Sequence, residues 1–417
     1  MSVPTRQSGW GGDVLVGVMA LVTPIVAVQG PAHTTVLDAV NAGFLLVYWT
    51  RILTRAEPIE LPLRAAMWLL LIGSLGGMVS AANRSVAVLT LVQDLYLYAW
   101  FVTLADFVTR HCRPLRVVVA WVAVACVVAL LAALDAYLGL FGGHFAGDVR
   151  ATGTFENPNM FGDYLMVSFF FAWAAAAAGW RIFYGAMAAL VAGVLATASN
   201  GALLGLLVGG VATLLASPTA QPRRRVGALL LGVGCAVALF AVSFERVQEE
   251  SLGMFAAPRG SIGGGAVKGY GERREVWAGL LESVRETPTG VGPGNFRTYT
   301  IAGDHSAHNE YLGMLAERGP LGLVAWLGVL LGAGREVARI RAARGRGYEP
   351  VAAAALLGLV AALAAHAAVV EMFHFRHVWF ALALLVALRA QAPMAPVVAS
   401  ASGARAFAPR VLVEVTS

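Results

Sequence analysis

Apolar segments long enough to cross a bilayer recur along the whole chain, separated by short polar turns. A membrane helix needs about 20 apolar residues, and we predict about twelve such helices, some slightly short. Their ranges are 12–29, 34–53, 65–82, 86–108, 116–140, 160–178, 181–198, 201–216, 226–244, 319–338, 351–370 and 374–390. Lipid admits only helices or closed barrels, and the alternation typical of barrel strands is absent from these segments, so we expect an all-α protein.

The longest polar segment separates the ninth and tenth predicted helices and divides the chain. We expect membrane helices over 1–244, a large loop over 245–318 and the last three helices over 319–390. The tail 391–417 is rich in Ala, Pro and Ser, a composition that predicts disorder.

The loop contains three successive predicted elements. A flexible Gly-rich stretch, 260–265, comes first. Residues 272–286 then predict an amphipathic helix that ends before Pro288. Its apolar positions at helical spacing are Val276, Trp277, Leu280, Leu281 and Val284. The following segment, 289–296, predicts a tight turn whose glycines allow positive φ.

Composition agrees with a membrane protein. Hydrophobic residues make up 58% of the chain and charged residues only 13%, whereas a soluble domain carries about a quarter. The net charge of +6 would suggest nucleic acid in a soluble protein. Here we expect the basic residues to sort by membrane side and expect no nucleic-acid partner.

Arginine placement predicts the orientation. Alternate loops are rich in Arg, and the loops between them carry few. Because positive residues accumulate on the cytoplasmic side, we expect both termini in the cytoplasm and the loop 245–318 outside. This is the topology of a multi-pass membrane protein with one large external loop.

His308 is the first candidate for chemistry. It ends the polar loop, next to Asn309 and Glu310, and opens a predicted helix. Histidine can accept a proton from a hydroxyl near neutral pH. The alternative is an interfacial histidine that caps the helix or donates to a carbonyl. His305 is equally suitable by composition, so spacing alone does not choose between them.

A second candidate site runs from Arg150 to Leu165. Its Asn157-Pro158-Asn159 sequence predicts a turn ending in a helix N-cap. Backbone N–H groups at such a helix start can hold an anion, and Arg150 could add a charge-assisted hydrogen bond. The alternative is a well-capped membrane helix.

Adjacent Arg273 and Arg274 form a third candidate site. Two neighbouring guanidinium groups could bind a diphosphate, and Arg297 is a weaker candidate for the same role. The alternative is a solvated helix face with ion pairs to Glu272 and Glu275.

Metal and nucleotide chemistry find little support. The histidines of segment 371–377 invite a metal interpretation, but aromatic and basic residues at a membrane interface need no metal. The sequence contains no Asp-x-Asp pair, phosphate-binding P-loop or dinucleotide fingerprint. We therefore expect no metal and no cofactor.

Four motifs in order resemble the O-antigen ligase and polymerase superfamily of bacterial envelope glycosyltransferases. The segment 150–165 resembles its Arg-x-x-Gly-Thr-Phe-x-Asn-Pro-Asn motif, and 198–202 its Ser-Arg-Gly turn. Segment 274–296 resembles its Arg-x-x-x-Trp and Pro-x-x-Gly-x-Gly-x-x-x-Phe run. Segment 308–322 resembles its His-Asn-x-x-Leu motif. Asn200 stands where the Ser-Arg-Gly turn has Arg.

The resemblance implies a GT-C-like membrane transferase that moves a glycan from undecaprenyl diphosphate to an acceptor hydroxyl. It selects His308 over His305 as general base, without metal or cofactor, in an inverting displacement. It also implies donor binding by Arg150, Arg273 and Arg274, for which we add Asn157 and Asn159. Supporting roles fall to Asn309, Glu310, Asn200, His305 and Arg297.

Several functions stay open within this resemblance. An O-antigen ligase uses the lipid A–core oligosaccharide as acceptor, a polymerase uses another lipid-linked repeat, and a protein O-oligosaccharyltransferase uses a protein. A secondary transporter is the alternative from another class. Transporters place ionisable groups in mid-membrane, whereas most of Asp38, Asp94, Asp106 and Asp135 lie near the ends of predicted helices.

Overall fold

The structure, a computed structural model, describes residues 10–24, 36–146, 150–218, 256–257, 260–261, 276–296, 307–343 and 350–391. Its labelled helices are α1 (Trp10–Val22), α2 (Val36–Arg55), α3 (Arg64–Met78), α4 (Arg84–His111), α5 (Pro114–Leu138), α6 (Pro158–Ala177), α7 (Phe183–Thr197), α8 (Asn200–Ala216), α12 (Glu310–Ala342), α13 (Pro350–Ala367) and α14 (Arg376–Gln391). A further helix covers 276–286. The expectation of an all-α protein is confirmed for these residues, apart from a two-residue ladder of β1 (Ala256–Ala257) with β2 (Gly260–Ser261).

The predicted membrane helices coincide with observed helices to within a few residues wherever the structure describes them. Two departures are larger: α1 ends at Val22, and α12 begins at Glu310, well before the predicted start at residue 319. The predicted span 226–244 and the tail 392–417 lie outside the described residues.

Four of the described helices, α4, α5, α6 and α12, are long and apolar enough to cross a membrane. Shorter apolar helices accompany them, including α3, α7 and α8. Large apolar side chains such as Leu46, Val47, Ile182 and Leu331 point away from the protein. Exposed aliphatic side chains of this kind are suited to contact lipid, as expected for a polytopic membrane protein.

Polar side chains fix the helix starts that matter for the site. The side chains of Asn83, Asn157, Ser199 and Asn309 accept hydrogen bonds from backbone N–H groups at the starts of α4, α6, α8 and α12. Such caps satisfy donors that a helix start otherwise leaves unpaired. The predicted cap of α6 is corrected by two residues: Asn157 is the cap and Pro158 is the first helical residue.

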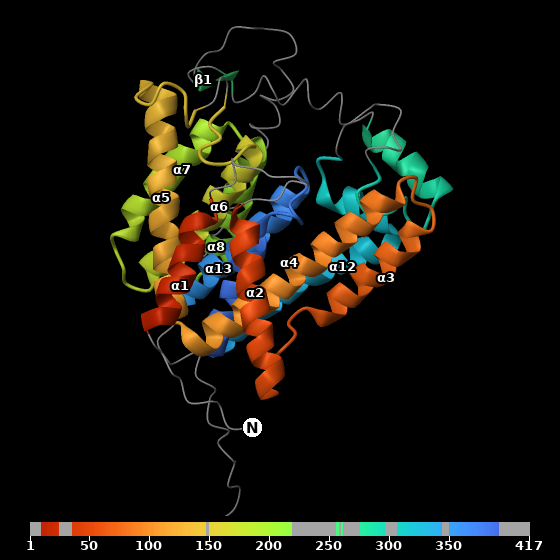
Figure 1. Ribbon diagram of the computed structural model, residues 1–417. Coiled ribbons are helices and arrows are strands. Elements are labelled where there is room, and N and C mark those ends of the chain that lie inside the picture. Colours follow the sequence, from red (N-terminus) through yellow and green to blue (C-terminus); the bar gives the residue numbers. More distant parts are fainter. Residues whose placement is uncertain are drawn as a thin grey trace, which may run out of the picture.

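Figure 1 shows α3, α4 and α12 lying together in one layer, while α5, α6 and α7 form the opposite side of the bundle. α13 packs against α6 and α8 and also contacts α12, and α14 packs against α4 and α12. The last two helices therefore join the two sides. Small residues allow the closest of these approaches, as where Gly209 of α8 faces Gly358 of α13.

A break in α12 marks the C-terminal end of the predicted polar loop. Gly319 has φ 64°, and Pro320 follows it, so the helix stops and restarts at this point. The carbonyls of Ala316 and Glu317 accept hydrogen bonds from the N–H groups of Val291 and Gly292, each at 2.9 Å. The glycine-rich turn is thus docked on the break.

The predicted features of the loop are confirmed in part. Gly290, Gly292 and Gly294 all have positive φ, as the turn prediction requires. The described part of the amphipathic helix, 276–286, buries Val276 and Leu280. Leu281 was wrongly placed on its apolar face, because this side chain is 50% exposed.

Candidate active site

His308 lies at the junction between the loop and α12. Its backbone has φ 46°, in the left-handed region that few residues other than glycine adopt. Its neighbours hold this conformation from both sides. Asn309 caps α12, its Oδ1 accepting from the Leu312 N–H at 3.1 Å, and the Trp277 indole N–H donates to the Ala307 carbonyl at 2.8 Å. Asn309 is therefore the N-cap of α12, and the half-buried His308 precedes it.

Glu310 ties the start of α12 to the segment between α13 and α14. Its buried carboxylate accepts hydrogen bonds from the N–H groups of Met372, at 2.5 Å, and Phe373, at 2.8 Å. The Tyr311 hydroxyl donates to the Ala364 carbonyl at 2.8 Å and adds a second link to α13. The position of His308 is thereby fixed relative to the last two helices.

Arg150 joins the first two predicted motifs. Its Nε–H donates to the Thr197 carbonyl at 2.8 Å, and its Nη2 donates to Asn159 Oδ1 at 2.7 Å. The Ser199 hydroxyl donates to the same amide oxygen at 3.1 Å, directly before Asn200 at the start of α8. The structure therefore brings segments 150–165 and 198–202 together, as neighbouring parts of one site require.

A buried carboxylate lies beneath these two motifs. Asp163 of α6 contacts His366 Nδ1 at 2.5 Å and His377 Nε2 at 2.7 Å. All three side chains are almost fully buried. His366 also lies directly against Gly201, where any larger side chain on α8 would collide with the imidazole. We call Asp163, His366 and His377 the closed centre.

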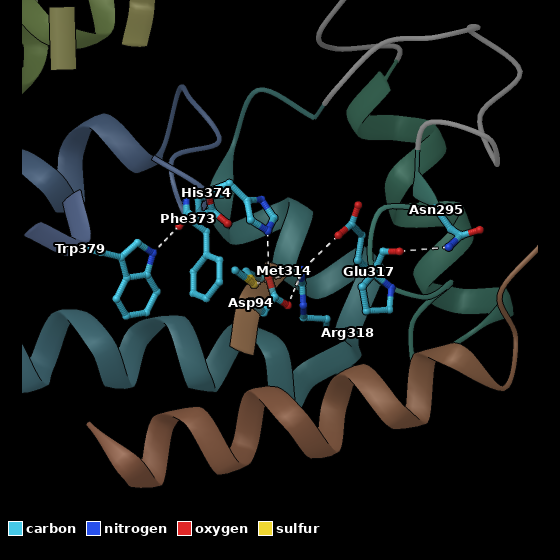
Figure 2. A network of polar contacts seen from close by, with 10 residues as sticks. Asp94, Asn295, Met314, Glu317, Arg318, Phe373, His374 and Trp379 are labelled. Atoms are coloured by element: carbon cyan, nitrogen blue, oxygen red, sulfur yellow. Dashed lines mark hydrogen bonds and ion pairs between the residues drawn. The ribbon is translucent and has the colours of Figure 1, made fainter. Parts of the chain in front are cut away.

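A second buried carboxylate lies beside the His308 segment (Figure 2). Asp94 of α4 accepts from Arg318 Nη2 at 2.9 Å and pairs with His374 Nε2 at 2.8 Å. Arg318 also donates to Glu317 at 3.0 Å. The Asp94 and Arg318 side chains are 1% and 2% exposed, whereas that of His374 is 37% exposed. We call Asp94, Arg318 and His374 the open centre.

The charge state of His374 follows from its neighbours. Burial disfavours the protonated imidazole, but the hydrogen bond and the negative charge of Asp94 outweigh burial, so the pKa of His374 lies above its ordinary value. Arg318 opposes this shift, and Glu310 reinforces it.

The contacts show that one end of the bundle holds these groups. The starts of α6, α8, α12 and α14 and the end of α13 meet there. His308, Arg150, Asn157, Asn159, Asn200, Asn309 and Glu310 all belong to this end. Four predicted site residues, Arg273, Arg274, Arg297 and His305, lie outside the described residues.

The sequence interpretation overlooked both centres. Asp94 was grouped with carboxylates near helix ends, yet it lies ten residues into α4 and is fully buried. Asp163 and His366 lie inside apolar spans. The signal was present, because an ionisable residue within a membrane helix faces the protein interior and needs a partner. Among the described residues, no group of three or more His, Cys, Asp or Glu could hold a metal ion.

Comparison with known protein families gives a match within the chain. Residues 185–327 match the family model described as O-antigen ligase. The matched region contains most of α7, all of α8, the glycine-rich turn, His308 and the break in α12, while segment 150–165 precedes it. No curated protein matches the chain. Residues 185–327 of the chain therefore carry the domain described as O-antigen ligase.

Proposed function

We propose that the enzyme transfers O-antigen polysaccharide from undecaprenyl diphosphate to a hydroxyl group of the lipid A–core oligosaccharide. The reaction takes place at the periplasmic face of the inner membrane and needs neither metal nor ATP. The observation that carries this proposal is the partly exposed His308, which lies inside the region that matches O-antigen ligase and whose neighbours Ala307 and Asn309 are held by hydrogen bonds.

In this reaction His308 is the general base. The acceptor oxygen attacks the anomeric carbon, the bond from that carbon to the phosphate oxygen breaks, and His308 takes the hydroxyl proton. A single displacement inverts the anomeric centre. The diphosphate is already a good leaving group, so it needs neutralisation of charge more than it needs an acid.

Arginine contacts to the diphosphate are the second part of the proposal. Arg273 and Arg274 are assigned to this role by the resemblance. Two donor groups of Arg150 already form hydrogen bonds to Thr197 and Asn159. Its contribution is therefore to hold the Ser199–Asn200 turn in place as well as to supply charge.

The test is the lipopolysaccharide pattern of a deletion strain complemented with His308→Ala. Loss of a general base costs about 10²- to 10⁴-fold in rate. We expect lipopolysaccharide without O-antigen and accumulation of the undecaprenyl-linked polymer. His144→Ala, at an exposed histidine in the loop after α5, is the control and should restore capping.

Two outcomes would contradict this assignment. Normal capping with His308→Ala would exclude His308 as the base. Lipopolysaccharide with a single repeat in the deletion strain would identify a polymerase instead of a ligase, because a polymerase extends the lipid-linked repeat before ligation.

Ion-pairing within the spans disfavours a transporter. Asp38 pairs with Arg376 at 2.6 Å, and Asp94 with Arg318. Asp135 accepts from four backbone N–H groups, including those of Phe141 and Phe145. Reconstitution with lipid-linked glycan and acceptor, without ATP or an ion gradient, should give glycan transfer.

A further inference from the structure

His374 is the only member of the open centre that is partly exposed. Its Nε2 faces Asp94, and its ring makes an edge contact with Phe373 at 5.5 Å between centroids. Within the described part of the chain, Nδ1 has no hydrogen-bond partner. One edge of the imidazole is therefore held by the protein, and the other is left for a ligand or water.

The exposed edge of His374 is poorly suited to face hydrocarbon. Charged groups in contact with lipid tails are costly and turn toward the protein interior or a water-filled space. His374 lies one residue from Phe373, whose N–H binds Glu310, two residues after His308. The imidazole and His308 thus flank the same hydrogen-bonded junction.

The groups around His374 favour a cationic imidazole. Asp94 of α4 accepts from both Arg318 and His374. Arg318 and Glu310 come from α12, and Glu317 takes part through Arg318. On the same segment, Arg376 is paired with Asp38. With Arg318 buried, the imidazole is the part of this cluster that can meet a ligand. Asp94 pairs with Nε2, so a ring that carries a second proton presents its Nδ1–H to that ligand.

We propose that His374 binds an anionic phosphate group of the lipid-linked diphosphate donor, its Nδ1–H donating to a phosphate oxygen while Asp94 orients the ring. This inference rests on the proposed function and adds a cation that the family motifs do not supply. It addresses a need created by Asn200, which stands where the resembling turn has Arg.

The test is binding of undecaprenyl diphosphate to the full chain in phosphatidylcholine nanodiscs between pH 5.5 and 9. A charge-assisted hydrogen bond of about 1.5–3 kcal/mol corresponds to a loss of roughly 10- to 100-fold when it is removed. We expect His374→Gln to bind that much more weakly at low pH and to lose most of the pH dependence. His374→Arg should retain tight binding at all pH values.

His144→Gln is the control, because it removes an exposed histidine from the loop after α5 and should leave binding unchanged. The unfolding midpoint of each variant is measured to check that the variant is folded. If His374→Gln does not fold, His374→Arg still decides, because its binding must be tight and independent of pH. Binding by His374→Gln with the affinity and pH profile of the unsubstituted chain would overturn the proposal.

A competition experiment distinguishes the donor diphosphate from the phosphates of bilayer lipids. Phosphatidylglycerol should compete poorly, and equal competition that depends on His374 would assign the residue to bilayer lipid and overturn the donor assignment. The assay requires no glycan transfer, so it separates the two proposals. If donor binding depends on His374 but the protein transfers no glycan, this inference stands and the proposed function is rejected. If His374→Gln leaves glycan transfer unchanged at limiting donor concentration, the proposed function stands and this inference is rejected.

Discussion

The closed and open centres are chemically similar and differ in exposure. Each has one aspartate in a membrane helix that is bound by two nitrogen-bearing side chains from later parts of the chain. In the closed centre both partners are buried histidines, and nothing there can meet a substrate. In the open centre one partner is buried Arg318, and the other, His374, reaches a surface. Exposure, and not the choice of residues, separates a brace between helices from a group available for chemistry.

The largest effect should come from removing Arg318. Arg318→Met leaves Asp94 buried with a half-exposed histidine as its one remaining side-chain partner, and breaking a buried ion pair costs about 3–5 kcal/mol. We expect a large fall in the unfolding midpoint in detergent. The double variant Asp94→Asn with Arg318→Met should recover part of the loss, because it removes both charges. Equal midpoints for the single and double variants would contradict this account of the open centre.

A smaller loss should follow disruption of the closed centre. Asp163→Ala removes the acceptor shared by His366 and His377 and leaves two buried imidazoles without it, but it leaves no arginine unpaired. We therefore expect about 2–3 kcal/mol, below the range for a permanent charge. Asp163→Asn, which keeps one acceptor oxygen, should cost less. A folded Asp163→Ala chain that loses glycan transfer completely would show that this centre is not merely a brace.

The smallest effect is a dependence of stability on pH. The raised pKa of His374 means that its interaction with Asp94 stabilises the fold fully below the unfolded-state pKa, near 6.5, and is lost as the pH rises through the folded-state pKa. Solvent screens a side chain that is 37% exposed, so the contribution should be about 0.5 kcal/mol or less. Unfolding midpoints of the unsubstituted chain and His374→Gln should converge at high pH.

The helices could be predicted from sequence because lipid imposes a simple rule on them. Long apolar runs bounded by Asn, Ser, Pro or Gly gave ends close to those of α4, α5, α6 and α8. The glycine turn was equally clear, because Gly290, Gly292 and Gly294 need positive φ. The break at Gly319–Pro320 also coincides with the predicted start of the tenth span.

The site was only partly accessible to the same reasoning. His308 and Arg150 stand out as polar residues next to helix starts. The pairing of Asp94 with Arg318 joins residues more than two hundred positions apart, and periodicity contains no information about such contacts. Leu281 shows the same limit on a small scale: helical spacing identified an apolar stripe but not which of its edges is covered.

The unbroken helical turns between His308 and the break at Gly319 also set a rotational phase. Each residue in an α-helix advances the chain by about 100°. Deleting or inserting one residue within 310–318 would therefore rotate the Asn309 cap and the His308 imidazole relative to the helix face on which Arg318 meets Asp94. The length of this short segment is consequently under stronger constraint than most of its side chains, and homologous enzymes should place their insertions elsewhere.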